Sequence, residues 1–364
     1  MTVRPKGSTS NRLNRLHAGT VEDIPSITVT FQMMDVSAKA FAIMTGYDYA
    51  SYPASGVSIT ELKDVDIVVN VKDDTAEDYI KMAHARQCVV RDFSFSYSVD
   101  GEATEEYTII GTKKRWFKND VVVEKFDTGT TSFSLAETPV QLKSGEYLLS
   151  AILDGVYLTE VVTADETGEY SISGTTVTTF DSRASQLIVV YQAIPTGANW
   201  SDTNDTTIPA AVRGMDIPVL ISAGNISRVQ SVTLNGAFNP ETVREMGNRE
   251  IVGYQSQIPS VTGTITVLDT DTELIALLTT GSINPSGITE FGVSDFTASG
   301  LDLEIKIQDP ADKTVPYTVV KTLYVPELVV TSEGFTSNVN SNAQQTFDIK
   351  SKTGELKIYK GAKA

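Results

Sequence analysis

The sequence predicts a mainly β protein, and three observations support that prediction. The composition is rich in Val, Ile, Thr and Tyr, which favour strands. In many short segments apolar and polar residues alternate, which is the period of a strand with one buried face. Turn signals such as Asp154-Gly155 separate many of these segments. The 364 residues suffice for two or three domains, each able to bury a core of its own.

Residues 1–20 are predicted to form a flexible basic arm. They contain Arg4, Lys6, Arg12 and Arg15 but no acidic residue, and no apolar run follows the charges as it would in a secretory signal. Elsewhere in the sequence no apolar run is long enough to cross a bilayer, so no membrane association is expected.

A strand pattern at residues 24–33 returns at residues 258–267. Ile-Pro-Ser opens both stretches, at an offset of 258 − 24 = 234 residues. At that offset Phe31 falls on Ile265, and apolar residues alternate with polar ones in both stretches. Each stretch is therefore predicted to be a strand with one apolar face and one polar face.

A short helix is predicted after each of these strands. A residue that can cap a helix, Asp35 in the first copy and Thr270 in the second, precedes about ten helix-favouring residues. A glycine, Gly46 or Gly281, then ends the pattern. Each copy is thus expected to contain a strand followed by a short helix.

Two further segments repeat in the same order. Residues 64–74 match residues 300–310 with the same alternation, and residues 89–111 match residues 329–351 without a gap, at an offset of 329 − 89 = 240. Three matched segments in one order indicate a duplicated domain. The identical residues of the last segment in the first copy are Val89, Val90, Phe95, Val99, Ala103 and Ile109.

The repeat also sets the predicted domain boundaries. The first copy is expected at residues 21–125 and the second at residues 228–364. Residues 126–194 have no counterpart in the repeat, and their short apolar runs between Gly, Asp and Ser turns predict a small antiparallel β domain, inserted on the exterior. Residues 195–227 begin with a polar stretch marked by Gly and Pro, which is typical of a linker or long loop.

The residue types that catalysis usually needs are scarce, so the chain is not expected to be an enzyme. The sequence has two histidines, His17 and His84, neither with an obvious partner, and no phosphate-binding or dinucleotide loop. The acidic stretch at residues 268–273 resembles half a calcium loop, but a capping box between Thr270 and Glu273 explains it more simply. No catalytic residue, cofactor or metal is therefore expected.

The pattern of each copy, alternating strands beside one short helix, resembles the tail tube proteins of long-tailed bacteriophages. The resemblance covers residues 24–111 and 228–351, and is clearest at residues 228–281, where a strand, a long excursion, a second strand and a helix follow one another. It implies two tandem tube-like β-sandwich domains. The inserted domain is similar to the small β domains that phage virion proteins carry as outward decorations.

The resemblance also implies a function. Tail tube domains join their strands with those of neighbouring subunits into hexameric rings, which stack into a hollow tube. Two such domains in one chain imply three chains per ring, with pseudo-sixfold symmetry. The implied place is the virion tail, after assembly in the host cytoplasm. The implied partners are copies of the chain together with tape-measure and terminator or tip proteins, and DNA would pass through without specific binding.

Candidate site residues follow from that reading and from the net charge of −17, since carboxylates facing a bore repel phosphates. The polar positions of two predicted strands and a serine row are the candidates for the bore: Asp64, Asp66, Asp302, Glu304, Ser94, Ser96 and Ser98. The long loop, residues 235–257, and the basic arm supply the candidates for contacts between rings: Asn239, Glu241, Arg244, Glu245, Arg249, Arg4, Arg12 and Arg15.

Two other functions remain open from the sequence. A trimeric tail hub or tail-tip protein also uses two tube-like domains per chain, but it caps the tube and stops at one ring. A β-rich adhesin or glycan-binding protein would instead use the inserted domain, with Tyr147, Tyr157 and Tyr170 available to stack on sugars.

Overall fold

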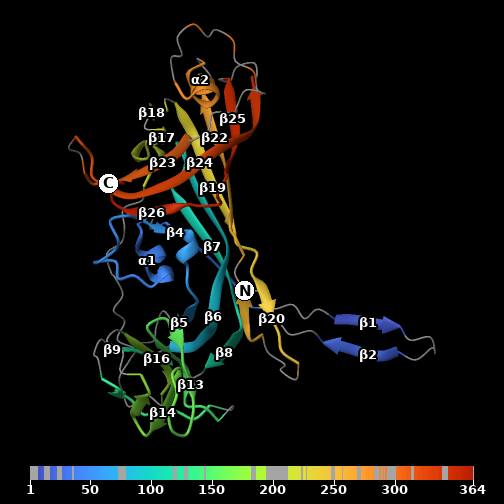
Figure 1. The fold of residues 1–364 in the computed structure, drawn as a ribbon, viewed down its shortest axis with the longest axis vertical. Coiled ribbons are helices and arrows are strands. Elements are labelled where there is room, and N and C mark those ends of the chain that lie inside the picture. The colour runs from blue at the N-terminus through green and yellow to red at the C-terminus, as the bar shows by residue number, and fades with distance from the viewer. Residues whose placement is uncertain are drawn as a thin grey trace.

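A computed structural model shows a mainly β protein, which confirms the predicted fold class (Figure 1). It describes residues 7–11, 17–22, 27–34, 37–72, 79–117, 121–126, 130–142, 145–181, 186–193, 212–222, 224–226, 228–246, 251–255, 257–268, 272–282, 287, 290, 292, 301–312, 315–337 and 343–363. Most of its strands belong to one large antiparallel sheet, and a smaller β domain lies at one end of the molecule (Figure 1).

The first unit, residues 27–117, contains the first matched segments. Four of its strands pair in the order β5, β6, β7, β3, and each pair is antiparallel. A fifth strand, β8, pairs with the beginning of β6. The strands are β3 (Ile27–Met33), β4 (Val57–Ser58), β5 (Val65–Lys72), β6 (Tyr79–Ser98), β7 (Thr104–Gly111) and β8 (Lys113–Phe117).

The second unit, residues 219–363, repeats this order. Its strands pair as β23, β24, β25, β22, again antiparallel throughout. The strands are β17 (Val219–Ile221), β18 (Gly224–Asn225), β19 (Val229–Ala237), β20 (Glu241–Val243), β21 (Gly253–Gln255), β22 (Ser260–Leu268), β23 (Leu301–Gln308), β24 (Val319–Thr336), β25 (Gln344–Ser351) and β26 (Lys357–Lys360).

The agreement between the two units extends to single residues. Phe31 pairs with Tyr107, and at the offsets found in the sequence Ile265 pairs with Phe347. Both long strands carry a β-bulge at the same place, before Asp92 in β6 and before Ser332 in β24. A second pair of bulges also corresponds, at Gln87 (φ 50°) and Glu327 (φ 46°), which have left-handed backbones although neither is a glycine.

Among the described residues each unit has one short α-helix, which follows its matched strand. Helix α1 (Lys39–Thr45) ends at Gly46 and α2 (Glu273–Thr280) ends at Gly281, both with φ 76°. The left-handed backbone explains why glycine stands there. The N-cap residue of α2 is Thr272, whose side chain makes no capping hydrogen bond. Thr270, the expected cap, lies outside the described residues.

Strand β19 joins the two units, because it pairs with β6 on one side and with β22 on the other. Strand β4 of the first unit also pairs with β26 of the second. One hydrophobic core runs through both units and includes Phe95, Leu234, Ile305 and Phe347. The tandem domains expected from the sequence therefore form a single body with a continuous core.

The inserted domain has two four-stranded sheets and a separate core around Leu153, Val177 and Tyr191. Its first strand is β9, which pairs with β16, so the domain starts at Val121 and not at residue 126 as expected. The strands are β9 (Val121–Phe126), β10 (Ser132–Ser134), β11 (Leu148–Leu153), β12 (Val156–Tyr157), β13 (Thr159–Glu160), β14 (Glu169–Ser173), β15 (Thr176–Thr179) and β16 (Leu187–Gln192).

Two segments expected to lack regular structure contain strands. The expected arm includes the hairpin of β1 (Gly7–Asn11) and β2 (His17–Glu22), which projects away from the body (Figure 1). The expected linker includes β17, β18 and a turn of 3-10 helix at Gly214–Asp216. Because β17 pairs with β23, the large sheet gains an edge that the local sequence did not reveal.

Candidate functional site: the polar face of the large sheet

One face of the large sheet carries small polar side chains across both units. They come from alternate positions of six adjacent strands and are exposed or half-buried. These residues, called the polar face below, are Thr30, Gln32, Asp92, Ser94, Ser96, Ser98, Glu106, Ser231, Thr233, Asn235, Ser260, Thr262, Thr264, Thr266, Thr346, Asp348 and Lys350.

The pairing register arranges these side chains in rows that cross from one unit to the other. Ser94 lies opposite Asn235, and Asn235 lies opposite Thr262. The Ser94 hydroxyl donates to Asn235 Oδ1 at 2.8 Å, and the Thr264 hydroxyl donates to Asp348 Oδ1 at 3.2 Å. The bond between Ser94 and Asn235 crosses from the first unit to β19, and the bond between Thr264 and Asp348 joins β22 to β25 within the second unit.

The opposite face of the same strands is core. Phe95, Leu234, Ile265 and Phe347 are each 1% exposed. A Cβ atom on Gly236 would lie 1.9 Å from the Phe93 ring, so only glycine lets β19 approach β6 at this point. The apolar face thus fixes the sheet, and the polar face is the side left to solvent.

The polar face carries few charges, and they are mixed. Its acidic residues are Asp92, Glu106 and Asp348, and its base is Lys350; Arg91, next to this face, forms a 2.5 Å ion pair with Asp92. A shallow depression of about 280 Å³ lies over β6 and β19, lined mostly by small or acidic side chains. The face therefore offers hydroxyl and amide groups, a slight excess of carboxylates and no cluster of cations among the described residues.

Four of the residues expected to line a bore lie elsewhere. Ser94, Ser96 and Ser98 belong to the polar face, but the four acidic candidates precede or lie on β5 and β23, beyond the bulges at Gln87 and Glu327. The acidic candidates therefore lie outside the six strands that carry the polar face.

Asp66 corrects the sequence-based expectation, because its side chain is buried, with 7% exposed. It accepts the backbone N–H of Gln87 at 3.0 Å and the Tyr157 hydroxyl at 2.5 Å, and it pairs with His84 Nε2 at 2.8 Å. Burial alone raises the pKa of the Asp66 carboxyl, but His84 and the hydrogen-bond donors outweigh burial and lower the pKa overall. Asp66 is thus a structural residue that also holds the inserted domain.

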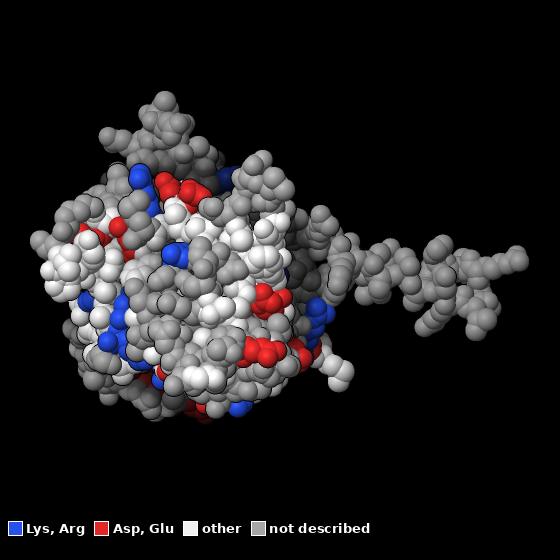
Figure 2. Space-filling model, turned by 90° about the horizontal axis from the view of Figure 1, so that it is seen from above, with Lys and Arg blue, Asp and Glu red and all other residues white. Residues whose placement is uncertain are grey.

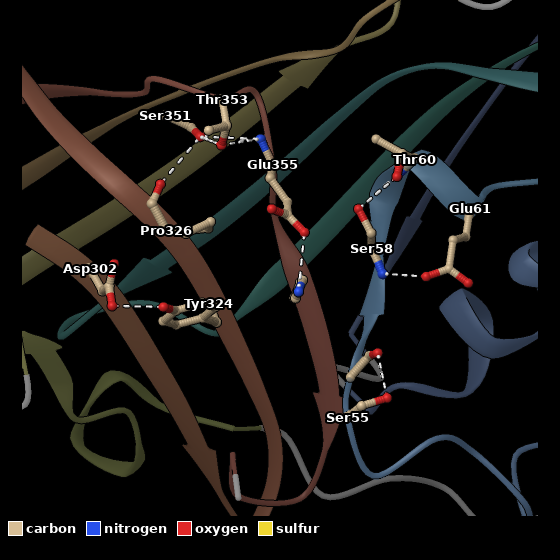
Figure 3. A network of polar contacts seen from close by, with 12 residues as sticks. Ser55, Ser58, Thr60, Glu61, Asp302, Tyr324, Pro326, Ser351, Thr353 and Glu355 are labelled. Atoms are coloured by element: carbon tan, nitrogen blue, oxygen red, sulfur yellow. Dashed lines mark hydrogen bonds and ion pairs between the residues drawn. The ribbon is translucent and has the colours of Figure 1, made fainter. Parts of the chain in front are cut away.

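Asp302 takes the corresponding position in the second unit. It accepts the Tyr324 hydroxyl at 2.7 Å (Figure 3) and the backbone N–H of Glu327 at 3.3 Å. Tyr324 stands where the first unit has His84, at the offset of 240. Each aspartate therefore satisfies the backbone N–H of a left-handed bulge residue.

The two remaining acidic candidates, Glu304 and Asp64, have different surroundings. Glu304 Oε2 lies 3.5 Å from Lys306 Nζ. Asp64 lines a cleft of about 490 Å³ between the first unit and the inserted domain, where Lys63 also lies. Burial and the neighbouring Asp66 raise the pKa of the Asp64 carboxyl.

The candidates for contacts between rings fall into two groups. Asn239, Glu241, Arg244 and Glu245 are exposed on the β20–β21 hairpin or just before it. The other candidates, Arg249, Arg4, Arg12 and Arg15, lie outside the described residues.

Two buried polar clusters were missed by the sequence analysis. One is the contact of His84 with Asp66, and the other is the ion pair of Lys321 with Glu105, both 0% exposed, which links β24 to β7. The Tyr97 hydroxyl also donates to Glu105, at 3.1 Å. Glu105 alternates along β7 with the same spacing as the buried Tyr107 and Ile109. This alternation in the sequence could have predicted that Glu105 is buried.

Two tyrosines proposed for sugar stacking have structural partners. Tyr157 donates to Asp66, and Tyr170, which is 3% exposed, donates to Glu160 at 2.8 Å. Burial and Glu160 raise the pKa of Tyr170 far above its ordinary value. Neither ring is presented as an open platform.

A scan of the chain against protein-family models finds no match. A search of curated proteins finds no match either. In the part of the chain that the structure describes, no group of three His, Cys, Asp or Glu side chains is placed to hold a metal ion. None of the described helices is long and apolar enough to cross a membrane.

Proposed function

We propose that this protein is a major subunit of a phage-type tail tube and acts by self-assembly, with its polar face lining the bore. The observation that carries the proposal is the polar face itself: it runs without interruption over two units whose strands pair in one order and register. A surface repeated within a chain is suited to be repeated around a ring.

The two units supply the ring geometry of the proposal. The equal pairing order and the corresponding bulges support an origin by duplication. Each chain would then contribute two of the six equivalent domains of a ring. Three chains would then close one ring. Such rings use head-to-tail contacts, in which one surface of a chain meets a different surface of the next.

The chemistry of the polar face suits passage of DNA without binding. Proteins hold DNA mainly by neutralising phosphates with Lys and Arg, which releases counterions. The polar face has one lysine against three carboxylates, and its other side chains are small. On the end of the molecule seen from above, both acidic and basic side chains are visible (Figure 2). A phosphate backbone would find little to retain it.

In this proposal the inserted domain lies on the outside of the tube. It has its own core and joins the first unit near Tyr157, away from the polar face. The partners would be copies of the chain, a tape-measure protein and terminator or tip proteins, and the place would be the virion tail. No catalytic step, cofactor or metal is part of the proposal.

Electron microscopy of the purified protein, with light scattering to count the chains in each particle, tests this function. We expect hollow tubes built from rings of three chains. Isolated three-chain rings that never stack would favour the tail hub. A stable monomer would contradict the proposal and favour an adhesin.

A further inference from the structure

Two valines and two phenylalanines occupy corresponding places in the two units but differ in exposure. Val89 is 8% exposed and Phe95 is 1% exposed in β6. Their identical counterparts in β24, Val329 and Phe335, are 38% and 57% exposed. The same apolar side chains are therefore covered in the first unit and left open in the second.

The cover in the first unit is the strand β19 and the residue after it. β19 pairs with β6 from Asp92 to Ser98. Phe238 then donates its backbone N–H to the carbonyl of Arg91 at 2.9 Å, and its ring lies 6.0 Å from that of Phe93. β6 is thus paired on both sides along this stretch.

The corresponding stretch of β24, residues 331–336, is paired on one side only. It pairs with β25, and no strand among the described residues lies on its other side. This open edge is defined here as the β24 edge. An open strand edge with exposed apolar side chains is a template for pairing with another chain.

We propose that the β24 edge binds the N-terminal segment, residues 1–6, of a second copy of the chain, placed as β19 and Phe238 are placed on β6. The inference rests on the proposed ring and names the surfaces that meet in it. The segment comes from a second copy, because in the view of Figure 1 the N-terminus of the chain itself is marked next to β20, whereas the β24 edge belongs to the part of β24 that pairs with β25.

The order of elements identifies this segment as the counterpart of β19. In the second unit β19 is followed by the β20–β21 hairpin and then by β22, and in the first unit the β1–β2 hairpin likewise precedes β3. Phe238 stands 258 − 238 = 20 residues before Ile258, and Arg4 stands 24 − 4 = 20 residues before Ile24. Arg4 therefore corresponds to Phe238.

The residues that would meet are complementary in charge. The Phe238 position becomes Arg4, and the Phe93 position becomes Glu333, so an aromatic contact inside one chain is replaced by a pair of opposite charges between chains. Glu333 accepts a hydrogen bond from Gln345 Nε2 at 2.8 Å, and no Lys or Arg of the described residues forms an ion pair with it. A charge pair at an interface selects the partner and the register.

A disulfide between two different chains tests the placement. Ala237 pairs with Asp92, so Val3 of one chain should lie opposite Ser332 of the next. A chain with Val3→Cys mixed with a chain carrying Ser332→Cys should give a two-chain band under mild oxidation, which reductant removes. The native Cys88 is buried, 0% exposed, and does not interfere. Replacing Ser332→Cys by Glu166→Cys, an exposed site of the inserted domain, should abolish the band.

Charge reversal gives an independent measurement. Glu333→Arg and Arg4→Glu should each raise the protein concentration needed for half-assembly by about tenfold or more, and the double variant should restore assembly. Glu166→Arg makes the same change of charge and should leave assembly unchanged. Particle mass from light scattering reports the result.

The outcomes separate this inference from the proposed function. Wild-type tubes combined with no cross-link between the Val3→Cys and Ser332→Cys chains, or normal assembly of Glu333→Arg, would overturn the inference and leave the tube intact. A wild-type chain that stays monomeric would overturn both.

Discussion

At the scale of single residues, the two bulge aspartates show what a strand pattern can and cannot predict. The alternation of residues 300–310 predicts one apolar face, and Ile305 on that strand is 0% exposed. Alternation also placed Asp66 and Asp302 on an outer polar face, but a β-bulge inserts a residue and turns the local backbone. Both aspartates bind the N–H of the bulge residue in the neighbouring strand, a contact that no local pattern encodes.

Replacing Asp66 with Asn should lower the free energy of unfolding by about 3 kcal/mol, because it removes one partner of a buried, hydrogen-bonded charge. The fold lowers the pKa of Asp66, so its stabilisation is present above the pKa of the unfolded carboxyl, about 3.9, and is lost as the pH falls through the folded pKa. Urea unfolding of both proteins from pH 7 downward measures the difference, which should shrink in acid.

Asp302→Asn is the matched control for that prediction. Asp302 accepts the Tyr324 hydroxyl where Asp66 has its histidine contact, and Asp302 is only half-buried, so its loss should cost less. Equal losses in the two variants, or a loss in Asp66→Asn that does not depend on pH, would contradict the role given to the contact between Asp66 and His84.

At the scale of elements, the matched segments were predicted well because their periodicity is local. The strands β3, β7, β22 and β25 and the glycine ends of both helices all lie where the repeat placed them. β9 and β17 were missed since each is fixed by pairing with a distant strand, β16 or β23, and not by its own sequence. The polar clusters around His84 and Lys321 are distant pairings of the same kind.

Ile305→Asp should unfold the second unit. The side chain is fully buried in β23 between β17 and β24, and a carboxylate there would have neither water nor a partner. We expect a loss of more than about 4 kcal/mol, compared with about 1 kcal/mol for Ile305→Val. Thermal unfolding followed by circular dichroism distinguishes the two variants. An unchanged melting temperature for Ile305→Asp would contradict the assignment of Ile305 to the buried face of β23.

Removing the inserted domain should leave assembly intact and lower the stability of the first unit. The cut must include β9: deleting residues 128–192 alone would leave β9 unpaired, whereas deleting residues 121–193 and joining the ends with a Gly/Ser linker removes the whole domain. Met82 and Phe117 lose their packing partners, so the melting temperature should fall. Electron microscopy of the deletion protein that shows no oligomers would contradict an exterior, decorative domain.

At the scale of the whole molecule, the two units form one body, which the repeat alone did not predict. β19 and the buried pair of Glu105 with Lys321 tie the units together. A fixed angle between the units is what a ring needs, because every later contact around the ring repeats it. The sequence showed two similar parts, and the structure adds the shared strand and the continuous core that join them.

Lysines placed on the polar face should convert a surface that lets DNA pass into one that holds it. Ser96, Thr233 and Thr264 lie side by side across three strands, so the triple change to Lys gathers three positive charges in one row. The variant should bind DNA with an affinity that falls steeply as salt rises, and the wild type should not. Filter binding measured from about 50 to about 200 mM salt, the range over which phosphate-based binding collapses, compares the two. Equal binding by both proteins would contradict the proposal that the wild-type polar face does not hold DNA.

In the proposed ring the polar face of two equivalent units surrounds a common axis. Electron cryo-microscopy of the assembled particles, reconstructed without imposed symmetry, tests it most directly. We expect rings of three chains in which six similar units turn the polar face, with Ser94, Thr233 and Thr264, toward the bore. A ring with that face on the outside, or one in which the two units do not take equivalent places around the axis, would contradict it.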